Sequence, residues 1–141
     1  MKLVDTNVLL YAVDSTSRHH DASLNWLDGA LAGTETIAFS WLALAGFIRI
    51  GTNPRVFARP LTTLEAVEQT ETWVGASPAR VLEPGPGHLA SLRRLLEPLG
   101  TAGNLVSDAH LAAIALEHRA TIVTYDNDFD RFAGVRWQRP A

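Results

Sequence analysis

Short runs of apolar and β-branched residues alternate with helical patterns along the whole chain, and this alternation constrains the fold more than any other feature. It predicts five strands, at about residues 2–5, 36–39, 80–82, 121–125 and 135–137. The intervening segments predict six helices, at about residues 7–13, 19–32, 40–51, 62–75, 87–97 and 107–119. Such alternation favours an α/β fold with three layers, in which helices cover both faces of a central, mainly parallel sheet.

The chain is predicted to form a single domain over residues 1–141. A chain of this length buries about two thirds of its unfolded surface on folding. We find no internal repeat, charge block or low-complexity tract that would mark a linker. The Pro/Gly cluster at residues 83–87 is predicted to be a turn inside the domain.

Composition excludes several classes of function. The sequence has no Cys, which rules out disulfides, thiolate metal sites and cysteine nucleophiles and suits a reducing compartment. No apolar run reaches the roughly 18 residues of a membrane span, so we expect a cytoplasmic protein with no membrane partner. The net charge of −3 argues against a protein that coats phosphates with basic side chains. If nucleic acid is the partner, cations must mediate the contact.

Three aspartates are predicted to meet at one edge of the sheet. Asp5 ends the first predicted strand, and Asp126 follows the fourth. Asp108 begins the helix that leads into that fourth strand, so it lies at the same edge because this helix runs antiparallel to the strands. Asp128 follows two residues after Asp126, close enough to join them. Ligands of parallel sheets bind at this carboxyl edge.

Each aspartate also has a purely structural explanation. Asp commonly caps helices and starts turns. Ser107 is predicted to cap the helix at 107–119, which leaves Asp108 in the first turn, where the helix dipole alone accounts for it. Taken together, however, clustered carboxylates repel unless a cation or protons lie among them. Oxygen ligands without Cys or a clear His set suit Mg²⁺, with Mn²⁺ as a substitute.

Four segments together resemble the PIN-domain ribonucleases of the VapC toxin type. They are MKLVDTNVLLYAVD at 1–14, SWLALAGFIRI at 40–50, NLVSDAHLAAIALEH at 104–118 and TIVTYDNDFDRF at 121–132. The resemblance covers nearly the whole chain in the usual order and spacing. It implies a PIN-like α/β/α domain and a Mg²⁺-dependent endoribonuclease that cuts tRNA or rRNA. It also implies a homodimer that a cognate VapB-type antitoxin silences.

The resemblance assigns site residues by position. The matching residues are Asp5, Asp108 and Asp126 as metal-binding and catalytic acids, Asp128 as an accessory acid, and Thr6 and Asn7 as accessory polar residues. Asp5 and Asp108 are then the principal Mg²⁺ ligands, while Asp126 binds directly or through water and orients the nucleophile. Two Mg²⁺ ions would change the net charge from −3 to +1, so the acidic balance does not exclude RNA.

One position departs from the family pattern. The family often has Glu in the helix after the second strand, whereas this chain has Gly46 there and no acid between Glu35 and Glu65. A site with four carboxylates and two metals is therefore in question. Either Asp128 takes the missing role, or one Mg²⁺ suffices until the RNA phosphate brings a second.

Two other functions compete with this interpretation. Aspartyl-phosphate enzymes and receiver domains also begin with a strand that ends in Asp, but they require a downstream Lys, and the only Lys is Lys2. A catalytically weak PIN-like binding module is the stronger alternative because Gly46 replaces an expected acid. Metal-dependent cleavage of RNA separates the enzyme from the binding module.

Some basic side chains are further candidates. Arg49, Arg55 and Arg59 could line a path for RNA phosphates near the edge after the third predicted helix, although surface Arg is common. His110 lies two residues beyond Asp108, and we expect it to be an exposed or supporting group rather than a catalytic base.

Overall fold

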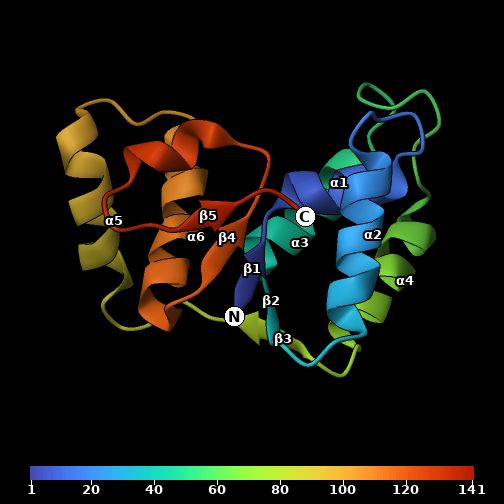
Figure 1. Ribbon diagram of the computed structural model, residues 1–141. Coiled ribbons are helices and arrows are strands. Elements are labelled where there is room, and N and C mark those ends of the chain that lie inside the picture. Colours follow the sequence, from blue (N-terminus) through green and yellow to red (C-terminus); the bar gives the residue numbers. More distant parts are fainter.

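The computed structural model describes residues 1–141 and contains one five-stranded sheet (Figure 1). The strands are β1 (Lys2–Val4), β2 (Ile37–Ser40), β3 (Ala79–Leu82), β4 (Thr121–Val123) and β5 (Trp137–Gln138). All four strand pairings are parallel, and the strand order is β3-β2-β1-β4-β5. The predicted α/β class with a central parallel sheet is confirmed.

Six α-helices cover the two faces of the sheet. They are α1 (Thr6–Val13), α2 (His20–Leu31), α3 (Trp41–Gly51), α4 (Thr63–Val74), α5 (His88–Leu96) and α6 (Leu105–His118). Figure 1 shows α1 to α4 on one side of the strands and α5 and α6 on the other. Short 3₁₀ helices follow α5 at Glu97–Leu99 and β4 at Asn127–Arg131. None of the helices combines the length and apolar character needed to cross a lipid bilayer.

The core is double because successive strand residues point to opposite faces. Leu3 packs in the cluster beneath α5 and α6, whereas its neighbour Val4 packs in the cluster beneath α1 to α4. Ile122 and Val123 of β4 divide in the same way. Both faces of the sheet are therefore buried, which explains why its strands are continuously apolar rather than alternating.

Chain order places a topological switch point between β1 and β4. From β1 the chain adds β2 and β3 on one side, using helices of one face. It then returns through α5 and α6 on the opposite face to place β4 on the other side of β1. Right-handed crossovers on opposite faces leave a crevice at the carboxyl ends of these two strands, where ligands of open α/β sheets bind.

Side chains cap the starts of three of the six α-helices, α1, α3 and α4. Ser40 caps α3 by accepting a hydrogen bond from the Ala43 backbone N–H at 3.2 Å. Thr62 and Glu65 form a reciprocal capping box at the start of α4. Asp5 was expected in the first strand, but it lies just beyond β1 and caps α1.

Ser107 is not the cap of its helix, and this prediction is wrong. Helix α6 begins two residues earlier, at Leu105. A turn through Gly103, whose φ is +48°, leads directly into the helix, with the Leu105 N–H bonded to the Ala102 carbonyl at 2.8 Å. Ser107 therefore lies within the first turn, next to Asp108.

Candidate metal centre

The crevice at the switch point contains an open pocket of about 270 Å³. Its walls come from the end of β1, the start of α1, one side of α3, the first turns of α6 and the loop after β4. The lining includes Asp5, Thr6, Asn7, Gly46, Arg49, Asp108 and Asp126. Five of the six predicted site residues thus share one pocket, and the sixth, Asp128, lies beside Asp108 and Asp126.

Asp5 is the most buried acid of the pocket, and hydrogen bonds hold both of its oxygens. Its Oδ1 accepts from the Thr6 backbone N–H at 2.7 Å. Its Oδ2 accepts from the Thr124 hydroxyl at 2.8 Å and from the Asn7 amide at 3.2 Å. Burial raises the pKa of Asp5 more than these bonds lower it, and the charge of Asp126 raises it further.

Asn7 and Thr124 join the ends of β1 and β4. The Asn7 amide donates to Asp5 and to the Thr124 hydroxyl at 3.0 Å, while its carbonyl oxygen accepts from the Tyr125 backbone N–H at 3.1 Å. The Thr124 hydroxyl also accepts from the Asp126 backbone N–H at 3.0 Å. Asn7 has no donor left for a ligand, so it acts by positioning the neighbouring groups. Sequence reasoning missed Thr124 because it continued the strand to residue 125.

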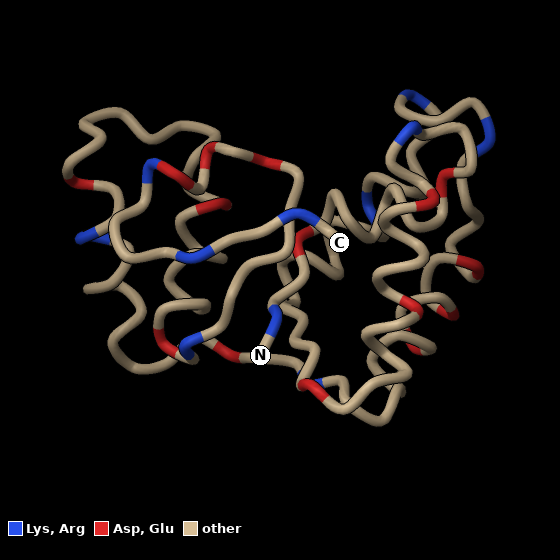
Figure 2. Tube along the Cα trace, viewed as in Figure 1, with Lys and Arg blue, Asp and Glu red and all other residues tan.

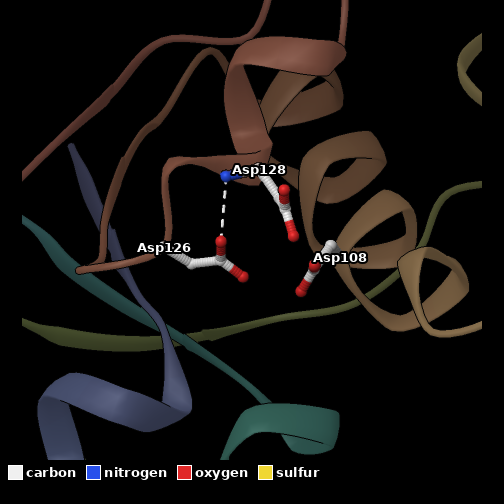
Figure 3. Close-up of side chains that lie close together, drawn as sticks. All are labelled: Asp108, Asp126 and Asp128. Atoms are coloured by element: carbon white, nitrogen blue, oxygen red, sulfur yellow. Dashed lines mark hydrogen bonds between the residues drawn. The ribbon is translucent and has the colours of Figure 1, made fainter.

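The carboxylates of Asp108, Asp126 and Asp128 face one another (Figure 3). One oxygen from each lies within 4.8 Å of the others. Burial, followed by the charges of Asp126, Asp5 and Asp128, raises the pKa of Asp108 to about 7. Without a cation, protonation of Asp108 relieves part of the repulsion below about pH 7.

A tight turn after β4 positions two of these acids. The Oδ1 atom of Asp126 accepts from the Asp128 backbone N–H at 2.8 Å, which caps the 3₁₀ helix and leaves Oδ2 outside this bond (Figure 3). Asp128 is about half exposed and forms an ion pair with Arg131 at 3.6 Å. The turn therefore presents both carboxylates to Asp108 from the same side.

The donor set fits a hard divalent cation. All donors of the cluster are carboxylate oxygens, and the pocket contains no sulfur and no imidazole. Oxygen-only sets of this kind suit Mg²⁺ and Mn²⁺ rather than zinc or copper. Asp108, Asp126 and Asp128 would hold such an ion, and Asp5 lines the same pocket outside this group.

The opposite wall lacks a carboxylate because α1 and α3 approach each other closely there. The Thr6 hydroxyl donates to the Ala43 carbonyl of α3 at 3.0 Å. A Cβ atom at position 46 would lie 3.1 Å from the same hydroxyl oxygen, tighter than most real contacts. The Thr6 backbone N–H is bonded to Asp5, so neither donor of Thr6 is free for a phosphate. Gly46 faces the pocket, as the match to the family's Glu position requires.

His110 is a supporting group outside the acidic pocket. Its Nδ1 lies 2.8 Å from Nε2 of His88, whose Nδ1 lies 3.0 Å from a Glu117 oxygen. Burial and the neighbouring His88 lower the pKa of His110. This hydrogen-bonded series of three side chains joins the start of α5 to α6, on the face of the sheet that α1 to α4 do not cover.

With this geometry established, comparison with known proteins identifies the class. The sequence of residues 2–135, nearly the whole chain, matches the protein family described as PIN domain. Ribonuclease VapC37 from Mycobacterium tuberculosis is 52% identical over 140 residues, which cover 99% of this chain and 97% of that protein. Ribonuclease VapC33 from the same organism is 39% identical over 99% of this chain and 98% of its own length. The chain therefore belongs to the PIN-domain family and, within it, to the VapC ribonucleases.

Solved structures agree on the fold. VapBC2 from Rickettsia felis, described as bound to a DNA fragment from its promoter, matches with a TM-score of 0.71 at 22% identity, covering 98% of this chain and 97% of that chain. VapC20 from M. tuberculosis, described as a sarcin-ricin loop cleaving toxin, matches with a TM-score of 0.67 at 15% identity over 96% and 99%. At these identities the two structures support the three-layer architecture alone.

The raised pKa of Asp108 predicts a pH-dependent effect of Mg²⁺ on stability. In the metal-free protein this group binds a proton in the folded state between its unfolded pKa of 3.8 and its folded pKa of about 7, so stability falls as pH rises through that window. A cation replaces the proton. Thermal melts with EDTA or Mg²⁺ should show a larger stabilisation by Mg²⁺ at about pH 8 than at about pH 5. An equal shift at both pH values would contradict this assignment; Asp108→Asn, as the control, should remove most of the difference.

Position 46 can be tested by adding the missing acid. Gly46→Glu should tighten Mg²⁺ binding in calorimetry, because the new carboxylate enters the pocket wall. It should also lower the melting temperature, since its Cβ meets the Thr6 hydroxyl, and this loss should shrink in a Thr6→Ala background by a coupling of about 1 kcal/mol. Ala45→Glu is the matched control, because it adds the same charge at an exposed position of α3 outside the pocket. Equal Mg²⁺ affinities for the two Glu variants would show that position 46 does not act on the site.

Proposed function

We propose that this chain is the toxin of a type II toxin-antitoxin system, a Mg²⁺-dependent endoribonuclease that hydrolyses phosphodiester bonds in RNA. The observation that carries this proposal is the convergence of Asp108, Asp126 and Asp128 beside the buried Asp5, in an open pocket at the switch point of the sheet. The full-length similarity to a protein named as a ribonuclease supports the same reaction.

The residues of the pocket divide the work of hydrolysis. A bound divalent cation supplies an activated water and a counter-charge for the developing phosphorane. Asp108, Asp126 and Asp128 hold that cation and orient the attacking water. Asp5, fixed by Thr124 and Asn7, lies beside the cluster and holds the two strand ends at a constant spacing.

We propose tRNA or rRNA as the substrate class. The pocket is open to solvent, as access by a looped-out strand requires, and the half-exposed Asp128 lies beside its acids. Lys and Arg residues are scattered over both halves of the molecule (Figure 2), so the protein offers no long basic track for a duplex. Binding then depends on cations at the acidic pocket and on a few nearby arginines.

We further propose a VapB-type antitoxin as the partner and a homodimer as the assembly. Several structural neighbours are described as VapBC complexes, among them those from R. felis and Haemophilus influenzae. A second hollow of about 340 Å³ has a mixed lining in which Val13, Phe57 and Leu61 are apolar, and these residues offer contacts for an apolar antitoxin segment. The acidic pocket would attract a basic side chain of the same partner.

The absence of an acid on α3 favours a second candidate, a PIN-like binding module with weak catalysis. Gly46 leaves the wall opposite the cluster without a carboxylate. Cleavage of total RNA by the purified chain, with Mg²⁺ or with EDTA, decides between the two functions. Cleavage that requires the metal supports the enzyme, and its absence in both Mg²⁺ and Mn²⁺ supports the binding module.

Substitutions of the acids should separate catalysis from folding. Asp108→Asn removes a charge from the cluster and relieves repulsion, so we expect RNA cleavage to fall at least about a hundredfold while the melting temperature of the metal-free protein holds or rises. Asp28→Asn, an exposed change on α2, is the matched control and should leave both unchanged. Cleavage at the parental rate by Asp108→Asn would show that this aspartate has only a structural role in the first turns of α6.

Asp5→Asn should behave differently from Asp108→Asn. Both Asp5 oxygens accept hydrogen bonds, and an Asn amide nitrogen in place of either oxygen cannot accept one. We therefore expect a loss of about 1–3 kcal/mol in the free energy of unfolding in addition to lost cleavage. Denaturant melts of the two Asn variants, measured side by side, check this contrast, and equal stabilities would contradict it.

The antitoxin should compete with the metal. If its basic side chain enters the acidic pocket, Mg²⁺ binding measured by calorimetry should be weaker in the complex than in the free chain, by about tenfold for one added positive charge near the ion. Co-expression with a neighbouring small protein and purification without a tag on that protein should recover the complex. Unchanged Mg²⁺ affinity in the complex would place the antitoxin away from the pocket.

A further inference from the structure

Helix α3 forms the wall of the pocket that faces the acids. The residues that it contributes are Leu42, Ala43, Gly46, Arg49 and Ile50, which share one side of the helix at spacings of three and four. Arg49 is the only basic residue in the lining of this pocket. The pocket is therefore polarised, with carboxylates on the side of β1, β4 and α6 and one guanidinium on the side of α3.

Arg49 is not engaged by the acids that share its pocket. The four ion pairs of the structure join the N-terminus to Glu35, His88 to Glu117, Arg93 to Glu97, and Arg131 to Asp128. Arg131, the other arginine near the cluster, is thus committed to Asp128, whereas Arg49 is exposed and forms no ion pair. Its five N–H donors are available to an anion that enters from solution.

The other two arginines that follow α3 in sequence lack this placement. Arg59 lines the separate hollow beside Val13 and Phe57, and Arg55 lines neither pocket. Of the three arginines, only Arg49 lies on the face of α3 that lines the acidic pocket. It lies about one turn after Gly46 on this face, and both residues line the pocket.

We propose that Arg49 binds a non-bridging oxygen of the scissile phosphodiester and supplies the positive charge that a carboxylate-bound second metal would otherwise bring to the α3 wall. This inference rests on the proposed ribonuclease function and assigns a substrate-contacting residue to it. Four ionised aspartates and one divalent cation leave two negative charges at the site, which would repel the phosphate. A planar guanidinium that binds phosphate oxygens in a fork offsets that repulsion.

Arg49→Gln tests the proposal, with Arg49→Lys as the conservative variant and Arg93→Gln as the matched control. Arg93 is exposed on α5 and pairs only with Glu97, the first residue of the 3₁₀ helix that follows. Two rates are measured in Mg²⁺, hydrolysis of bis(4-nitrophenyl) phosphate and cleavage of total RNA. Mg²⁺ affinity is measured separately by calorimetry without substrate.

We expect Arg49→Gln to lower both rates about a hundredfold, Arg49→Lys to retain part of the rate, and Arg93→Gln to match the parent. Removing a positive charge from the pocket should leave Mg²⁺ affinity unchanged or make it up to about threefold tighter. Opposite directions for Mg²⁺ binding and catalysis would distinguish a phosphate contact from a residue that merely supports the acids.

Two results would overturn the assignment. If the parent is active and Arg49→Gln retains its rate, Arg49 does not contact the reacting phosphate, and the ribonuclease proposal stands without it. If Arg49→Gln weakens Mg²⁺ binding in proportion to its loss of rate, the residue holds the metal site together instead. A parent that hydrolyses neither substrate in Mg²⁺ or Mn²⁺ would instead reject the ribonuclease function itself, and the role of Arg49 with it.

Discussion

The buried Asp5 carboxylate is the interaction on which the rest of the site depends. It lies where β1 ends, caps α1 through the Thr6 N–H, and accepts a hydrogen bond from Thr124 at the end of the neighbouring strand β4. Because the bond from Thr124 joins residues 119 apart in sequence, each just beyond its strand, it fixes the spacing of the two strand ends. The same Thr124 hydroxyl accepts a hydrogen bond from the Asp126 backbone N–H, at the start of the turn that carries this aspartate. One buried charge thus sets both the fold at the switch point and the position of the acids beside it.

The close approach of the carboxylates lowers the stability of the metal-free fold and favours metal binding, because both effects arise from their mutual repulsion. Asp108 on α6 and Asp126 and Asp128 on the turn after β4 are held close together. The helix and the turn cannot move apart without disturbing the core. The repulsion appears as the raised pKa of Asp108. A divalent cation removes that repulsion, so the unfavourable energy of the metal-free cluster becomes part of the affinity for the ion.

The fold and the location of the acids could be predicted because both follow from burial. Continuous apolar strands alternating with helices permit few topologies, and parallel strands bring their carboxyl ends to one edge. The hydrogen-bond network could not be predicted, since it depends on which side chain leaves the strand first: β4 ends at Val123 and frees Thr124 for Asp5. The start of α6 was misplaced for a similar reason, because the turn at Gly103 stands in for a side-chain cap.

The position of Asp108 also depends on contacts far from the pocket. Its helix packs in the core through Leu111 and Ile114 and through several alanines, which let the backbone approach closely. On the other side of α6, the chain from Glu117 through His88 to His110 supplies directional bonds that alanine packing cannot. These bonds reach along two turns of the helix, from residue 110 to residue 117. Helix α6 is therefore held by apolar packing on one side and by hydrogen bonds on the other. This keeps Asp108, near the start of the helix, in a fixed position relative to the turn after β4.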